Sequence, residues 1–290
     1  MVPAPDTPDV EAVAAWLTRE RGGEWAPLAR RDHLVLADAT RVAKIPFRAD
    51  GAARVRHGLV EARRVGVERR ALPPVEDDAL ESPWGPVSLW PRLEHRPLRG
   101  ATITRREAGE LGHALGLVST TPLGGPAVWN PFGRVPLRLA ASRYDDGLTG
   151  AVADMVERVR AATPDPTTWV YGHGDAGLSN ALATATGVWL IDFDSAGLVP
   201  VGWDMATMYL HLVLTLGRAD AFAGFSTGWR AAAETPGDWP TWLATRAASG
   251  TAYLLTLSAS EERAAAIRSR IGSLGRWART GEPLSVLANA

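Results

Sequence analysis

The chain contains no cysteine, which excludes disulfide bonds, cysteine-ligated zinc and thiol nucleophiles. It also lacks a long apolar run, because the longest one, after Asp204, is interrupted by His211 and Arg218 and is too short to cross a bilayer. The first residues, MVPAPDTPD, have neither the basic start nor the apolar stretch of a secretory signal. We therefore expect a cytoplasmic protein without membrane contacts.

An excess of charge of either sign is missing too, because the formal net charge is −1. Without an overall basic field, we expect no nucleic acid among the partners; the sequence says nothing about the oligomeric state. Its 290 residues are enough for one large domain or for two lobes with separate cores.

Lysine is nearly absent as well: of 31 basic residues, only Lys44 is a lysine. A genome rich in G and C drifts toward arginine wherever either residue serves, so a single lysine suggests a chemical role or chance survival on a surface strand. Lys44 lies within Arg41–Phe47, which reads as a strand that pairs with His33–Ala37 across a short turn.

The pattern of the chain changes after about residue 98. Before that point, helical spacing over Thr7–Glu20 and Ala53–Ala71 alternates with short strand-like runs, the last being Trp84–Trp90. After it the chain is mostly helical, with the clearest helices at Thr104–Val118 and Leu148–Ala162. We expect an α+β fold with a small mixed sheet and helix lobe over residues 1–90 and a large, mainly helical lobe over residues 91–290.

Within the helical part, a short strand at Trp169–Gly172 precedes a hairpin formed by Ala181–Thr184 and Val188–Ile191. Asp175 precedes the hairpin, and Asn180 follows five residues later. Phosphoryl transfer needs a group that orients the attacking hydroxyl and takes its proton, and oxygen ligands for Mg²⁺.

A second aspartate, Asp192, lies at the far end of the hairpin. Because the hairpin folds back, Asn180 and Asp192 can face one ion, and Mg²⁺ prefers few protein oxygens.

The pattern His-Gly-Asp-x4-Asn followed by Ile-Asp-Phe-Asp resembles the signature of aminoglycoside phosphotransferases and related antibiotic and small-molecule kinases. The resemblance implies a protein-kinase-like two-lobe fold, ATP or GTP as phosphate donor and Mg²⁺ as cofactor. It implies that Asp175 is the catalytic base, that Asn180 and Asp192 are the metal ligands, and that His173 orients the loop.

The same resemblance assigns further residues. Lys44 resembles the strand lysine that holds the α- and β-phosphates, and Glu61 the helix glutamate that pairs with it, with Glu68 as the rival. Asp204 matches the aspartate that braces the catalytic loop. The connector after the last strand, whose residues Trp90 and Leu93 we single out, would present backbone groups to the adenine.

One departure from the family concerns the loop that covers the nucleotide. Arg30–His33 occupies its place without a glycine, so the sequence does not show which residues of this loop contact the phosphates.

Two other enzyme classes are disfavoured. Gly224–Gly228 matches the nucleophile elbow of hydrolases but lies in an alanine-rich helical segment. A Walker A motif is excluded because the only lysine, Lys44, lies in Val-Ala-Lys-Ile and does not follow a glycine.

The acceptor is suggested only by position. Residues 161–217 hold five aspartates and no lysine or arginine, which would favour a cationic acceptor through the local potential. Asp194 is open between a metal contact, an acceptor contact and a cap of the hairpin end. The candidate acceptor-binding residues are Asp194, Tyr209, His211, Glu261 and Glu262.

We expect a phosphotransferase that acts on a small-molecule hydroxyl, either of an antibiotic of the aminoglycoside, macrolide or peptide type or of an amino-alcohol or sugar metabolite. A catalytically silent kinase-fold binding protein is the alternative from another functional class. The presence of Asp175, Asn180, Asp192 and Lys44 argues against silence.

Overall fold

The computed structural model describes residues 9–30, 33–46, 51–124, 129–282 and 284. The chain divides into two compact units: the first comprises Met1–Leu98 and Ser179–Ala196, and the second comprises Arg99–Leu178 and Gly197–Ala290. This division lies eight residues after the expected boundary at residue 90, and it returns the hairpin segment to the first unit.

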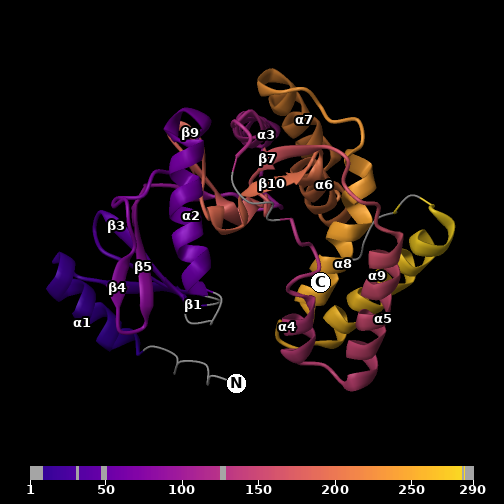
Figure 1. The fold of residues 1–290 in the computed structure, drawn as a ribbon, viewed down its shortest axis with the longest axis horizontal. Helices are drawn as coiled ribbons and strands as arrows, with labels where there is room; N and C mark the ends of the chain where they lie inside the picture. The colour runs from indigo at the N-terminus through magenta and orange to yellow at the C-terminus, as the bar shows by residue number, and fades with distance from the viewer. Residues whose placement is uncertain (1–8, 31–32, 47–50, 125–128, 283, 285–290) are drawn as a thin grey trace. The chain divides into compact units, whose positions relative to one another are not determined.

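A five-stranded antiparallel sheet forms the centre of the first unit (Figure 1). Its strand order is β1-β2-β3-β5-β4, so β3 lies in the middle. The bounds are β1 (Ala26–Arg30), β2 (His33–Ala37), β3 (Arg41–Pro46), β4 (Leu80–Ser82) and β5 (Gly85–Pro91). The alternation read in the sequence therefore predicted β2 and β3 correctly, to within one residue at the end of β3.

Helices cover both faces of this sheet. Helix α1 (Val10–Arg21) begins at Asp9, whose side chain caps it, and buries Val13, Trp16 and Leu17 against the strands. Ala43 and Ile45 of β3 belong to the same core. Because side chains alternate along a strand, Lys44 points to the opposite face, where α2 (Gly51–Val65) packs on β3 and β5.

The hairpin β8 (Ala181–Thr184) and β9 (Gly187–Leu190) joins the first unit through backbone hydrogen bonds. Strand β6 (Arg96–Pro97) pairs with β8, and the N–H of Leu72 donates to the carbonyl of Leu190 at 2.9 Å. These long-range pairings explain why the hairpin belongs to the first unit, although the residues before and after it in the sequence belong to the second.

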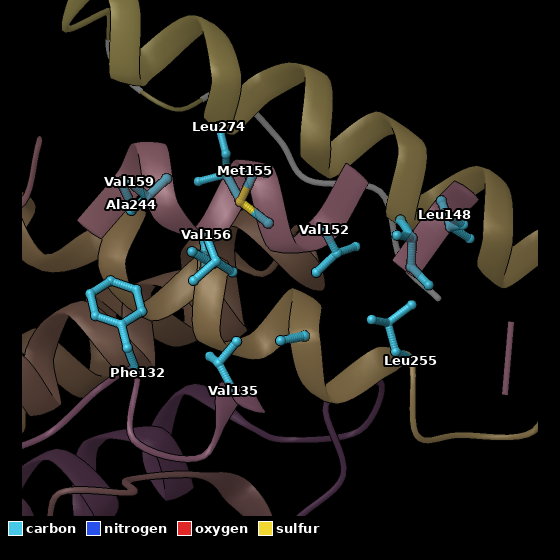
Figure 2. Packing of buried hydrophobic residues seen from close by; sticks show 14 of the residues in the cluster. Phe132, Val135, Leu148, Val152, Met155, Val156, Val159, Ala244, Leu255 and Leu274 are labelled. Atoms are coloured by element: carbon cyan, nitrogen blue, oxygen red, sulfur yellow. The ribbon is translucent and has the colours of Figure 1, made fainter. Parts of the chain in front are cut away.

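The second unit is mainly helical. It contains α3 (Arg105–Ser119), α4 (Val135–Ala140), α5 (Asp146–Ala162), α6 (Trp203–Tyr209), α7 (Ala219–Ala232), α8 (Leu243–Leu254) and α9 (Glu261–Thr280). Figure 2 shows one of its hydrophobic cores, in which Val152, Met155 and Val156 of α5 face residues of α8 and α9. The two predicted helices appear as α3 and α5, with ends that differ by one or two residues.

Helices α3 and α7 approach closely through glycines. A Cβ atom on Gly228 would lie 1.8 Å from the carbonyl oxygen of Gly109, and one on Gly112 would lie 2.0 Å from that of Phe225. The segment Gly224–Gly228 is therefore a helix-packing surface within α7, without the strand that a nucleophile elbow requires.

Two further elements belong to this unit. Strand β7 (Trp169–Gly172) pairs with β10 (Gly197–Pro200), and a π-helical segment (Leu210–Thr215) continues α6. Within the described ranges, no helix is both long and apolar enough to span a membrane.

Candidate active site

Lys44 forms two ion pairs inside the first unit. Its Nζ donates to Asp192 Oδ1 at 2.6 Å and to Asp194 Oδ2 at 2.8 Å. Burial alone would lower the pKa of Lys44, but the two carboxylates outweigh it and raise that pKa above its usual value. Lys44 is therefore an ammonium ion, held by residues about 150 positions away in the sequence.

Asp194 is the more buried of the two carboxylates, with 8% of its surface exposed. Burial raises its pKa, while the charge of Lys44 acts in the opposite direction. His33 and Arg54 also lie near Asp194 Oδ2, at 3.7 and 4.0 Å. This setting ties Asp194 to Lys44, and its role towards an acceptor stays a prediction.

Asp192 has an uncommon backbone conformation, with φ 65° and ψ 56° in the left-handed region. Such strain is found most often where a side chain must be aimed precisely. The backbone N–H of the preceding Ile191 donates to the carbonyl of Asn180 at 3.0 Å, which links the two ends of the hairpin.

The donor set of Asn180 and Asp192, one amide oxygen and one carboxylate, fits Mg²⁺, which completes its shell with water and phosphate oxygens. Across the described residues no three His, Asp or Glu side chains form a metal cluster, and a magnesium site of this type needs none.

Other predicted nucleotide-site residues also lie in the first unit. Glu61 is buried on α2, where it forms an ion pair with Arg64 at 3.3 Å and its Oε1 lies 3.9 Å from Nδ1 of His57; its pairing with Lys44 stays a prediction. Its rival Glu68 pairs with Arg69 in the turn after α2. Trp90 ends up within β5, and its Nε1 donates to Ser88 Oγ at 2.9 Å.

Leu93 follows β5 in the connector and is partly buried. In the glycine-free loop from Arg30 to His33, residues 31 and 32 lie outside the described residues.

The His-Gly-Asp loop belongs to the second unit and follows β7 directly. Asp204, at the start of α6, accepts from the N–H of His173 at 2.7 Å and from that of Gly174 at 3.1 Å. Burial raises the pKa of Asp204, and the nearby His173 and these N–H donors oppose that rise. A Cβ on Gly172 would lie 3.0 Å from Asp204 Oδ2, so glycine there allows the carboxylate to approach.

Asp175 itself is half exposed and forms an ion pair that the sequence did not suggest. Nη2 of Arg246, on α8, donates to Asp175 Oδ1 at 2.5 Å. Arg246 is one of many arginines and lies 71 residues after Asp175, so no local pattern marks it.

His211 lies in the π-helical segment, a type of irregularity that occurs frequently at functional sites. Burial lowers its pKa, and so do the charges of Arg246 and Arg270; Asp175 acts in the opposite direction. His211 is therefore neutral at pH 7, beside a positively charged arginine.

The remaining acceptor candidates have different settings. Tyr209 packs against Phe222 and Trp239, with ring centroids 4.9 and 4.7 Å away. Glu261 and Glu262 are exposed in the first turn of α9, and Glu261 pairs with Arg268 at 3.0 Å. The two glutamates thus have a solvent-facing position.

Comparison with known proteins agrees with the motif. Residues 33–247 match the model of the phosphotransferase enzyme family. The chain belongs to this family. No curated protein matches it significantly. Solved structures do match it.

Three solved structures resemble this phosphotransferase over nearly their whole length. An amicoumacin kinase in complex with AMP-PNP, Ca²⁺ and Ami is 14% identical, with a TM-score of 0.71; the match covers 96% of this chain and 95% of that one. A choline/ethanolamine kinase family protein from Mesorhizobium loti is 17% identical, with a TM-score of 0.65; the match covers 91% of this chain and 94% of that one. A microcompartment-associated aminopropanol kinase is 15% identical, with a TM-score of 0.64; the match covers 96% of this chain and 100% of that one. The protein-kinase-like fold that the motif implied is thereby confirmed.

Proposed function

We infer that the chain transfers the γ-phosphate of ATP or GTP to a hydroxyl group of a small molecule. The observation that carries this inference is the contact of Lys44, the only lysine, with Asp192 at 2.6 Å across 148 residues of sequence. Phosphoryl transfer needs a cation for the phosphates next to oxygen ligands for their metal ion, and this pair supplies both kinds of group.

In this proposal the first unit binds the nucleotide. The ammonium group of Lys44 contacts the α- and β-phosphates, and the connector near Trp90 and Leu93 borders the base. Asn180 and Asp192 would hold Mg²⁺, which neutralises the charge on the phosphates. The pairing of Lys44 with Asp192 supports these roles because it keeps the lysine charged and aims it beside the metal ligands.

Asp175 takes the proton of the attacking hydroxyl. Its carboxylate is half exposed, and Asp175 directly follows two residues whose backbone is fixed. Asp204 accepts from the N–H groups of His173 and Gly174, and Nε1 of Trp203 donates to the carbonyl of Gly174 at 2.9 Å. A fixed backbone limits the motion of the base, which favours catalysis by orientation. His173 is buried in this loop and orients it.

The acceptor is an antibiotic of the aminoglycoside, macrolide or peptide type, or an amino-alcohol or sugar metabolite. The similar structures support both groups, since one is an amicoumacin kinase and another an aminopropanol kinase. We place the reaction in the cytoplasm, where nucleoside triphosphates are available.

The test is acceptor-stimulated release of ADP or GDP by the full chain, with ATP or GTP, Mg²⁺ and a panel of aminoglycosides, macrolides, peptide antibiotics, amino alcohols and sugars. Turnover that depends on one acceptor supports the proposal. Nucleotide binding without turnover for any acceptor would instead support the silent binding protein.

A further inference from the structure

The charge around Asp175 differs from what the sequence suggested. The aspartates of residues 161–217 predicted a negative local potential, but Asp192 and Asp194 are paired with Lys44, and Asp175 is paired with Arg246. Asp204 accepts two backbone hydrogen bonds. Four of the five aspartates thus have partners, and the partner of the proposed base is an arginine of the same unit.

Arg246 has donors left for a ligand. A guanidinium group carries five N–H bonds on three nitrogens. Among the described residues, Arg246 makes a hydrogen bond through Nη2 alone, to Asp175, and its side chain is 21% exposed. Its Nε and Nη1 can therefore bind a second anion while it stays beside Asp175, and a planar carboxylate or phosphate matches this fork.

The surroundings of Arg246 add positive rather than negative potential. Arg270 of α9 is buried, with 7% exposure, and its charge reaches His211, as does the charge of Arg246. His211, as a neutral imidazole, can donate or accept one further hydrogen bond. A polycation placed next to Asp175 would meet these arginines and be repelled.

We propose that Arg246 binds an anionic group of the acceptor, a carboxylate or a phosphate carried close to the hydroxyl that is phosphorylated. This inference rests on the proposed function, because it assumes that an acceptor hydroxyl is phosphorylated. It narrows the acceptor to a hydroxy acid, a zwitterion or a phosphorylated alcohol, and it disfavours a polycationic aminoglycoside. Arg246 is a specificity-determining residue that keeps its contact with Asp175 through Nη2 and binds the substrate through Nε and Nη1.

The first experiment measures anion binding without turnover. Thermal unfolding of the nucleotide-free full chain is followed with increasing glycerate and, separately, inorganic phosphate. We expect both anions to stabilise the protein, Arg246→Met to weaken their apparent affinity roughly tenfold or more, and Arg230→Met to leave it unchanged. Arg230 is an exposed residue of α7 and serves as the matched control.

Two variants locate the bound anion. Lys44→Met should leave glycerate binding intact, because Lys44 pairs with Asp192 and Asp194, whereas Arg246 pairs with Asp175. Asp175→Asn should tighten glycerate binding, because the negative charge next to the bound anion is gone. Equal weakening by Arg230→Met, loss of binding in Lys44→Met, or no stabilisation of the wild type by either anion would each overturn the proposal.

The second experiment uses turnover with matched acceptors: homoserine against homoserinol, and glycerate against glycerol. We expect the acid of a pair to be at least about tenfold better in kcat/KM, and Arg246→Met to raise the KM of the acid but not that of the nucleotide. A better neutral analogue overturns the proposal. If no compound stimulates turnover, the proposed function is at fault, while the anion-binding result still decides the role of Arg246.

Discussion

Gly58 of α2 lies directly against Asp194, so closely that a Cβ atom on the glycine would be 2.4 Å from Asp194 Oδ1. This contact explains how a buried carboxylate is held beside Lys44 by the helix on its face of the sheet. The ionic cluster of Lys44 with Asp192 and Asp194 thus depends on the close approach of the α2 backbone at Gly58.

Gly58→Ala should destabilise the protein by about 1–3 kcal/mol, because the added methyl group pushes Asp194 away from Lys44 and this overpacking exceeds the gain in helix propensity. Gly250→Ala is the matched control. Gly250 lies within α8 and a Cβ there meets nothing within 4 Å, so that substitution should stabilise by about 0.5–1 kcal/mol. Urea unfolding of both variants measures the difference, and equal effects would contradict the account of the contact.

Lys44→Met should cost about 3 kcal/mol of unfolding free energy, because it leaves two neighbouring carboxylates, one of them buried, without their closest cation. It should also weaken nucleotide binding. Lys44→Arg keeps the charge and should recover most of the stability but less of the nucleotide affinity, because the guanidinium is larger. Denaturant unfolding and nucleotide titration separate the two effects; unchanged nucleotide affinity in Lys44→Met would contradict our interpretation of the single lysine.

Asp204→Ala should loosen the loop before Asp175, because it removes the acceptor of the His173 and Gly174 N–H groups. A buried N–H left without a partner costs about 1–3 kcal/mol. Hydrogen exchange at these two amides should accelerate in Asp204→Ala and less in Asp204→Asn, whose amide oxygen still accepts. Unchanged exchange would mean that other contacts hold the loop.

Asp38 provides a test of pH dependence in the turn before β3. Burial alone would raise its pKa, but the hydrogen bonds from Arg41 and Thr40 outweigh it and lower that pKa below the ordinary value of 3.8. The charged form is therefore favoured in the folded state, so its contribution to stability is present above pH 3.8 and is lost as the pH falls through the folded value.

The stability difference between the wild type and Asp38→Asn should accordingly shrink when urea unfolding is repeated at decreasing pH from 7 to about 3. Asp220→Asn is a useful comparison, because Asp220 is exposed and its hydrogen bond from Arg218 lowers its pKa to about 2. A difference for Asp38→Asn that stays constant over this range would show that the carboxylate charge is not what stabilises the turn.

Much of the fold could be predicted from local patterns. Strand alternation predicted β2 and β3, and helical spacing predicted α3 and α5. The short helix α4 was missed because its six residues lie at the end of a segment rich in glycine and proline. Strand β10 was missed because its four residues become a strand only through pairing with β7.

The site shows the same limit. The motif suggested Asp175, Asn180, Asp192 and Asp204 because their spacing is local and specific. Arg246 could not be predicted, since its contact with Asp175 depends on how α8 packs. Likewise, the sequence suggested a negative local potential from five aspartates, but Asp192 and Asp194 pair with Lys44 and Asp175 pairs with Arg246. These pairings depend on the fold and could not be read from the sequence.

The central claim is that Asp175 takes the proton of an acceptor hydroxyl during phosphoryl transfer. It is tested most directly by the rate of acceptor-dependent ADP or GDP formation in the wild type and in Asp175→Asn, with the phosphorylated product identified by ³¹P NMR. We predict a loss of at least ~10²-fold in kcat, about 3 kcal/mol, with nucleotide affinity unchanged. Transfer by Asp175→Asn at the wild-type rate would contradict the account.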